Sequence, residues 1–200
     1  MHWQTSRYRI DLSQPKVMGV VNVTPDSFFD GGLHASVSAA ITHCQRLVAE
    51  GADMLDIGGE STRPGADSLG AAHELTRVLP VLREALRLGV PVSVDTSEPM
   101  VMREALALGA DIINDVRALQ RPGAVAAVAA HPKAGLCLMH MRGEPTDMQS
   151  LTDYDDVLTD VRSFLAARMQ AAESAGVAGE RIVLDPGIGF GKLPDHNLAL

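Results

Sequence analysis

The sequence predicts a single α/β domain folded as a parallel (β/α)8 barrel. Short apolar runs alternate with amphipathic stretches six times along the chain, and a polar residue lies at the end of each apolar run. The length of 200 residues is typical of one domain, because single cores extend over roughly 100–250 residues. With 46% hydrophobic and 21% charged residues, the composition excludes a wholly disordered chain.

Each predicted strand is almost continuously apolar, which is typical of strands buried on both faces of a parallel sheet. The six predicted strands are 17–23, 54–59, 91–96, 111–116, 134–140 and 181–187. The amphipathic stretches predict helices over 38–50, 69–88, 99–108, 123–131 and 154–175. A Gly-Ala-Asp repeat at 51–53 and 109–111 leads into two of the strands. Strands that alternate with helices at this spacing predict a parallel sheet.

An open doubly wound sheet is the alternative to a barrel. No Gly-x-Gly-x-x-Gly joins the first strand to a helix, so the dinucleotide-binding form of that sheet is not favoured. A barrel builds its active site at the carboxyl ends of its strands, and polar residues end all six predicted strands. These residues are Asn22, Glu60, Asp95, Asn114, His140 and Asp185. We therefore predict one barrel domain over residues 1–200, lacking the two C-terminal βα units that would close it.

Charge and cysteine content exclude several classes of protein. The chain carries 17 Lys and Arg against 25 Asp and Glu, so nucleic acid is not a predicted partner. No apolar run approaches the roughly 18 residues of a membrane helix, and residues 1–4 contain no signal-peptide core. Cys44 and Cys137 lie far apart in apolar surroundings, so no disulfide is expected. These features predict a cytoplasmic protein without a membrane partner.

Three strand-end residues are the strongest candidates for ligand binding. Asp95, Asn114 and Asp185 end the third, fourth and sixth predicted strands, so their side chains can converge on one cavity. Two carboxylates and an amide suit a heterocycle edge that presents N–H donors, as an aminopyrimidinone does. Asn22 and Arg63 follow neighbouring strands and can hold an anionic group together with a hard cation. The combination predicts a flat heterocycle with a charged tail.

Each of these features also has a purely structural interpretation. Thr-Pro-Asp at 24–26 and Gly-Gly at 31–32 are ordinary turn chemistry. Asp185 can cap the loop that follows it, and Arg63 alone can form a surface ion pair. Residue by residue, these alternatives stay open, and only the set taken together favours a binding site.

Six segments resemble, in order, the signatures of the dihydropteroate synthase family. They are 17–28 (VMGVVNVTPDSF), 56–65 (DIGGESTRPG), 94–96 (VDT), 113–115 (IND), 139–143 (MHMRG) and 185–192 (DPGIGFGK). The resemblance covers the chain from about Ile10 onward, and its first two segments are long and specific.

The resemblance implies a homodimeric TIM barrel of folate biosynthesis, the target class of sulfonamides. The family joins 7,8-dihydropterin-6-ylmethyl diphosphate to 4-aminobenzoate and releases diphosphate. Carried over by motif, Asp185, Asp95 and Arg63 are the expected catalytic residues, and Asn22 is expected to reach Mg²⁺ and the diphosphate. The remaining expected substrate contacts are Asn114 and Met139 to the pterin, Thr62, Arg63 and Pro64 to diphosphate and aminobenzoate, and Gly189 and Phe190 between the two substrates.

Two other functions remain as alternatives. A methyltetrahydrofolate–corrinoid methyltransferase resembles this chain in its barrel and its Asp…Asn…Asp pocket, but gives no reason for the segments at 17–28 and 56–65. A non-catalytic, synthase-like binding protein is the second alternative. It is suggested by the absence of the family's later Lys-Ser/Thr-Arg and Arg-x-His segments from these 200 residues.

Overall fold

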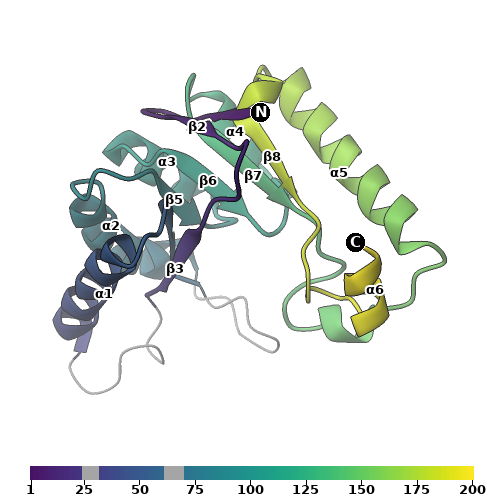
Figure 1. Ribbon diagram of the computed structural model, residues 1–200, viewed down its shortest axis with the longest axis horizontal. Coiled ribbons are helices and arrows are strands. Elements are labelled where there is room, and N and C mark those ends of the chain that lie inside the picture. Colours follow the sequence, from purple (N-terminus) through teal and green to yellow (C-terminus); the bar gives the residue numbers. More distant parts are fainter. Residues whose placement is uncertain (24–31, 61–69) are drawn as a thin grey trace.

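A curved parallel sheet with helices on its outside organises the molecule (Figure 1). The computed structural model describes residues 1–23, 32–60 and 70–200, without the side chains of 32–36. The sheet contains, in spatial and sequence order, β3 (Met18–Asn22), β4 (Met54–Gly58), β5 (Val92–Asp95), β6 (Ile112–Asp115), β7 (Gly135–Met139) and β8 (Ile182–Asp185). The helices are α1 (Gly32–Ala49), α2 (Ala71–Ala85), α3 (Pro99–Leu108), α4 (Ala124–Ala129), α5 (Val157–Ser174) and α6 (Pro194–Ala199).

The six predicted strands and five predicted helices are confirmed in their order and type. Neighbouring helices from α1 to α5 pack in sequence against one another, as the outer helices of a barrel do. The sequence did not predict α6, nor the antiparallel hairpin of β1 (His2–Gln4) and β2 (Arg9–Asp11). Strands of three residues are too short to show a periodic pattern, which explains why the hairpin was missed.

Both copies of the Gly-Ala-Asp repeat make the same contacts, one between α1 and β4 and the other between α3 and β6. Gly51 and Gly109 both have positive φ angles, of 102° and 114°, and each lets the chain leave a helix sharply. Two residues later, Asp53 Oδ2 accepts a hydrogen bond from the Val17 amide at 2.8 Å, and Asp111 Oδ2 accepts one from the Val92 amide at 2.9 Å. The repeated aspartate therefore ties the start of its own strand to the chain entering the preceding strand.

The hairpin plugs the amino-terminal end of the barrel. Trp3 and Ile10 pack there against Met54 and Ile112, and the Trp3 indole nitrogen donates a hydrogen bond of 2.9 Å to the Arg181 carbonyl. This small core lies inside the sheet. A larger one fills the space between the sheet and helices α1 to α4, with outward-facing strand residues such as Leu55 at its centre.

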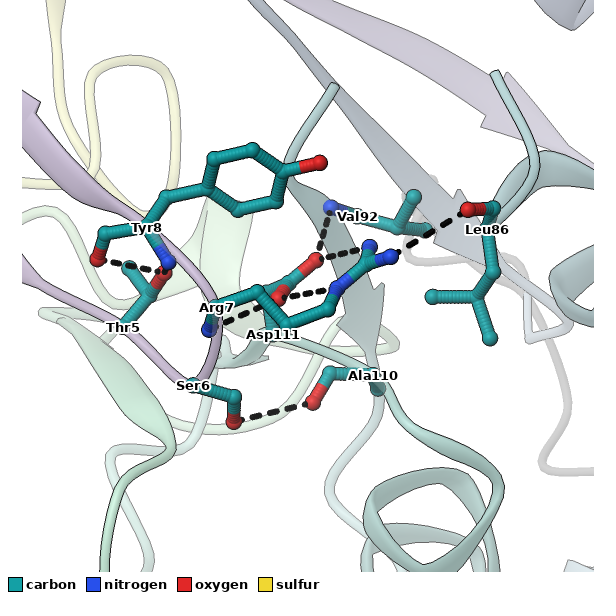
Figure 2. Close-up of polar contacts among 8 residues, drawn as sticks. All are labelled: Thr5, Ser6, Arg7, Tyr8, Leu86, Val92, Ala110 and Asp111. Carbon is teal, nitrogen blue, oxygen red and sulfur yellow. Dashed lines mark hydrogen bonds and ion pairs between the residues drawn. The ribbon is translucent and has the colours of Figure 1, made fainter. Parts of the chain in front are cut away.

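A charged network fastens the hairpin to the sheet (Figure 2). The Arg7 guanidinium binds both oxygens of the buried Asp111 carboxylate, with Nε–Oδ1 and Nη2–Oδ2 distances of 2.9 and 2.6 Å. Its third nitrogen, Nη1, donates to the Leu86 carbonyl at 3.2 Å, and the Ser6 hydroxyl donates to the Ala110 carbonyl. The hydrogen bond to Asp111 raises the pKa of Arg7 further. The guanidinium and the backbone amides that surround the Asp111 carboxylate all donate hydrogen bonds to it, and the positive charge of Arg7 compensates its negative charge.

The barrel is open between its first and last strands. Within the described residues, β3 pairs only with β4, and β8 pairs only with β7. Apolar side chains are exposed on both edges, with 54% of Val20 and 43% of Leu184 accessible. The fold is therefore the predicted α/β class with a six-stranded parallel sheet, and it leaves two unpaired edges. No helix in the described part of the chain is long and apolar enough to cross a membrane.

Candidate active site

Strand register brings three of the predicted site residues to one level of the barrel. Asn22 on β3 pairs with Gly58 on β4, Gly58 pairs with Asp95 on β5, and Asp95 pairs with Asn114 on β6. Residues in register on parallel strands point to the same face of the sheet. The register therefore brings together Asp95 and Asn114, two of the three residues expected to converge, and places Asn22 on the same face.

Gly58 leaves an open space between Asn22 and Asp95. A Cβ at this glycine would lie 3.4 Å from Asn22 Oδ1 and 3.6 Å from Asp95 Oδ2. These two side chains therefore face one another across a position without a side chain. A ligand can approach the backbone of β4 at this point, which a larger residue would prevent.

Asn114 is held by Asp56, a residue that the strand-end pattern did not single out. Asn114 Nδ2 donates a hydrogen bond of 3.0 Å to Asp56 Oδ2. The Asn114 carbonyl oxygen Oδ1 and the second carboxylate oxygen of Asp56, Oδ1, are buried and have no hydrogen-bond partner in the described structure. Asp56 fixes the amide so that its oxygen remains an acceptor for a ligand. A signal for Asp56 existed, since it is a charged residue in the middle of the apolar strand 54–58.

Carboxylates concentrate negative charge around this row. Burial raises the pKa of Asp95 well above its ordinary value, and the charges of Asp56 and Asp115 raise it further. Burial likewise raises the pKa of Asp56, against the effect of the hydrogen bond from Asn114. Glu74, at the start of α2, is 2% exposed, and burial raises its pKa to about 7. A ligand that donates N–H groups or carries positive charge would relieve this repulsion.

Asp115 follows Asn114 directly but has a structural role. Its carboxylate accepts hydrogen bonds from the Ser97 hydroxyl at 2.5 Å and from the amides of Arg117 and Leu119 at 2.8 and 2.7 Å. These bonds hold a turn in which Ala118 and Leu119 have positive φ angles. Successive strand residues face opposite sides of the sheet, so the Ile-Asn-Asp motif supplies one side chain to the lumen and one to the outer scaffold.

Asp185 lies at the end of β8, in register with Met139 on β7. Its Oδ1 accepts a hydrogen bond of 2.7 Å from the Gly187 amide, whereas Oδ2 accepts none from any described residue. The interpretation of Asp185 as a loop cap is therefore confirmed for one oxygen, and the other oxygen is left for a ligand. A Cβ at Gly187 would lie 1.9 Å from the His140 carbonyl oxygen, so only glycine allows the loop to pass so close to β7.

Two other predicted residues, Met139 at the end of β7 and Phe190 in the loop after β8, belong to one cluster. Met139 is buried and packs with Val116, Met141 and Met148, and Phe190 packs against the same cluster. Gly189 is held by two side chains: its amide donates to Asn197 Oδ1 at 2.9 Å and its carbonyl accepts from Gln149 Nε2 at 3.0 Å. Thr62, Arg63 and Pro64 lie outside the described residues.

The family described as pterin binding enzymes matches residues 18–200. The chain is 50% identical over 200 residues to the dihydropteroate synthase of Neisseria meningitidis serogroup C, covering 99% of this chain and 71% of that protein. It is 50% identical over 192 residues to the Escherichia coli K12 dihydropteroate synthase, covering 96% of this chain and 68% of that protein. The chain belongs to the dihydropteroate synthase family.

Solved structures agree with this assignment. Yersinia pestis dihydropteroate synthase in a sulfonamide drug complex superposes with a TM-score of 0.92 at 47% identity, covering 100% of this chain and 73% of that one. The Burkholderia cenocepacia dihydropteroate synthase, complexed with 7,8-dihydropteroate, superposes with a TM-score of 0.88 at 49% identity. The match covers 100% of this chain and 68% of that one. The predicted family, fold class and function, a transferase acting as dihydropteroate synthase, are confirmed by these matches.

Proposed function

We propose that Asp95, Asn114 and Asp185 bind the pterin ring of the diphosphate substrate and that Asp185 also assists its reaction. The observation that carries this proposal is the set of free acceptors at the carboxyl end of the sheet. Asn114 Oδ1, Asp56 Oδ1 and Asp185 Oδ2 all lack a hydrogen-bond partner in the described chain. Unpaired buried acceptors are costly, and a heterocycle edge that presents N–H groups would satisfy them.

The negative charge of the aspartates in this set suits the reaction. The C–O bond between the pterin methylene and the diphosphate breaks with its electrons on the diphosphate, which leaves positive charge on the methylene carbon. An ionised Asp185 across the pterin would stabilise this charge as it develops. The aniline nitrogen of 4-aminobenzoate then forms the new C–N bond and loses a proton to solvent. No strong base is needed, so most of the rate must come from positioning and leaving-group stabilisation.

Asn22 is the proposed protein contact for Mg²⁺. Its amide oxygen is exposed on the site side of Gly58, and an oxygen ligand of this kind suits a hard cation. Within residues 1–23, 32–60 and 70–200, no cluster of three or more His, Cys, Asp and Glu side chains lies at metal-binding distances. Mg²⁺ is ordinarily held by one or two protein oxygens together with substrate phosphates, and one amide fits that pattern. When bound, the ion supplies charge stabilisation to the leaving diphosphate.

The remaining assignments follow the family motifs. Thr62, Arg63 and Pro64 are proposed to contact diphosphate and aminobenzoate, and Met139, Gly189 and Phe190 to border the pterin. The grouping of Met139 with Phe190 in one buried cluster supports the last of these. We also propose a cytoplasmic homodimer, and a single pterin-binding barrel domain to which residues 1–200 contribute six βα units. The unpaired edges of β3 and β8 support this description of the domain.

Thermal-shift titration tests the proposed function. At a ligand concentration of one hundred times Kd, binding adds about 2.7 kcal/mol, which raises the Tm of a chain of this size by about 5–10 °C. We expect this response with dihydropterin diphosphate in the presence of Mg²⁺, and a smaller one without Mg²⁺. A response to methyltetrahydrofolate alone would indicate the methyltransferase alternative, and a response to neither would indicate a non-catalytic protein.

The Arg63→Ala variant tests the position of the diphosphate. Because a guanidinium binds the charged tail and not the heterocycle, this variant should respond less to the diphosphate substrate and equally to bare pterin. Equal losses for both ligands would contradict the placement of Arg63.

A further inference from the structure

Lys192 carries a buried positive charge that the proposed mechanism does not use. Its side chain is 4% exposed, and its ammonium donates hydrogen bonds to the Gly187 carbonyl at 2.9 Å, the Phe190 carbonyl at 3.0 Å and His140 Nδ1 at 3.0 Å. The His140 carbonyl oxygen is a fourth, longer contact at 3.4 Å, so acceptors are present for all three hydrogens of the ammonium group. No carboxylate of the described residues lies within ion-pair distance of Lys192, so the lysine is bound by dipoles and not by a counter-charge.

The loop that Lys192 holds has no regular structure of its own. Between Asp185 and Lys192, three glycines adopt positive φ angles of 69°, 84° and 64°. Glycine-rich backbone of this kind is intrinsically mobile, and its buried carbonyls need partners from elsewhere. Gln149 and Asn197 bind Gly189 from one side, while Lys192 binds the carbonyls of Gly187 and Phe190 from the other.

The lysine also connects this loop to the neighbouring strand. His140 directly follows Met139 at the end of β7, and Gly187 passes so close to its carbonyl that a side chain would not fit. Gly187 in turn donates its amide to Asp185 Oδ1. A continuous set of contacts therefore runs from His140 through Lys192 and Gly187 to the carboxylate proposed to bind the pterin.

We infer that Lys192 is a positioning residue, which holds the 186–191 loop against His140 so that Asp185 and Phe190 keep the separation that the pterin ring requires. This inference deepens the proposed function and rests on it. Lys192 does not touch the substrate in this arrangement, and it acts through the two loop carbonyls and His140.

The ionisation of the two side chains agrees with their geometry. Burial lowers the pKa of His140 to about 4, and the charge of Lys192 lowers it as well. Burial lowers the pKa of Lys192 to about 8, although Asp185 acts in the opposite direction. Near pH 7 the lysine is therefore charged and the histidine neutral, which makes Nδ1 the acceptor and the ammonium the donor.

The test compares two variants of the full chain with the wild type. Lys192→Met keeps the length of the side chain and removes its three donors. Lys133→Met makes the same change at an exposed lysine and serves as the matched control. Two quantities are measured: the Kd for bare pterin by calorimetry, corrected for the folded fraction from circular dichroism, and hydrogen–deuterium exchange of the amides of residues 187–191.

Lys192→Met should weaken pterin binding by about 10- to 100-fold, because small displacements of binding groups have effects of this size. Exchange of the amides of residues 187–191 should accelerate at least about tenfold while β4 to β6 stay protected. Lys133→Met should match the wild type in both measurements. Faster exchange with an unchanged Kd would overturn the inference, since Lys192 would then stabilise the loop without positioning the site. A wild-type chain that binds no pterin would contradict the proposed function itself.

A second variant covers the case in which Lys192→Met does not fold. His140→Leu removes the Nδ1 acceptor and leaves the lysine in place, so the same two changes should appear with smaller amplitude. If Lys192→Met does fold, the loss of affinity in the double variant should be less than the product of the separate losses, because both residues act through one contact. A His140→Leu chain with wild-type Kd and wild-type exchange would overturn the inference.

Discussion

The two ends of this barrel treat buried aspartates in opposite ways. At the amino-terminal end, Asp111 accepts two hydrogen bonds from the Arg7 side chain and one each from the Arg7 and Val92 amides (Figure 2). At the carboxyl end, Asp95 accepts no hydrogen bond from any described residue, and burial raises its pKa well above the ordinary value. At the amino-terminal end, hydrogen bonds from the protein satisfy the aspartate carboxylate and stabilise the fold. At the carboxyl end, the aspartate carboxylate has no such donor from the described residues and is available to a ligand.

The largest expected effect comes from Asp185→Asn at the carboxyl end. The variant keeps Oδ1 as the acceptor for the Gly187 amide, but it loses the charge and presents a donor to the pterin. Losing a charged contact in a shielded site costs about 2–4 kcal/mol, so kcat/KM should fall roughly 30- to 1000-fold. The measurement is diphosphate release at saturating 4-aminobenzoate, normalised to the folded fraction.

Separate effects on kcat and KM sharpen this test. Weaker ground-state binding raises KM, whereas lost stabilisation of the developing cation lowers kcat. Values of both within about threefold of wild type would contradict the assigned role, because a charged hydrogen bond contributes more than that. A loss of stability without a loss of turnover per folded molecule would mean that Asp185 is only a loop cap.

At the opposite end, Asp111→Asn should reduce stability and leave ligand binding intact. The variant breaks a two-point ion pair whose carboxylate is fully buried, while Arg7 remains 40% exposed and can be hydrated. We expect the free energy of unfolding in urea to fall by about 1.5–3 kcal/mol.

Asp53→Asn is the matched control for Asp111, since Asp53 occupies the same place in the other Gly-Ala-Asp copy. Asp53 is 34% exposed and its partner Lys16 is 30% exposed, so the loss of stability should be much smaller than in Asp111→Asn. A tenfold loss of pterin affinity in Asp111→Asn would remove the distinction between the two ends.

The pH dependence of stability in Glu74→Gln tests whether negative charge at the carboxyl end destabilises the fold. Burial raises the pKa of Glu74 from its ordinary value of 4.5 to about 7 in the folded chain. Between these pH values the folded chain retains a proton that the unfolded chain releases, so this residue lowers stability as pH rises. The variant should exceed the wild type by about 1–3 kcal/mol at pH 8 and match it near pH 4.

The control for Glu74 is Glu84→Gln in the same helix, where the carboxylate pairs with Arg87 and is 38% exposed. Its effect should not exceed about 0.5 kcal/mol at either pH. A Glu74→Gln chain whose urea midpoint shows the same pH profile as the wild type would disprove the raised pKa.

Apart from the control variants, the smallest expected change in stability belongs to Asp95→Asn, and its sign is opposite to that of Asp111→Asn. Removing a buried, unpaired charge should raise the free energy of unfolding at pH 7 by about 0.5–2 kcal/mol, while pterin affinity falls. Urea unfolding and calorimetry on the same preparation provide both values. If Asp95→Asn destabilises the chain as Asp111→Asn does, the carboxyl end does not hold unsatisfied charge.

The sequence by itself determined the order and type of the six strands and five main helices. Apolar runs and helical periodicity are local signals, and Gly109 and Asp156 mark helix ends through contacts within a few residues. The strand-end residues Asp95, Asn114 and Asp185 were found in the same way, because strand polarity alone places them at one edge.

Only the tertiary structure decided which of these charged groups are satisfied. Arg7 and Asp111 are 104 residues apart in sequence, Asp56 and Asn114 are 58 apart, and His140 and Lys192 are 52 apart. The sequence contains Asp56, Asp95 and Asp111 as similar residues at or within predicted strands, and nothing local distinguishes them. Hydration and charge compensation depend on neighbours in space, so the same side chain is a structural tie at one end of the barrel and a free acceptor at the other.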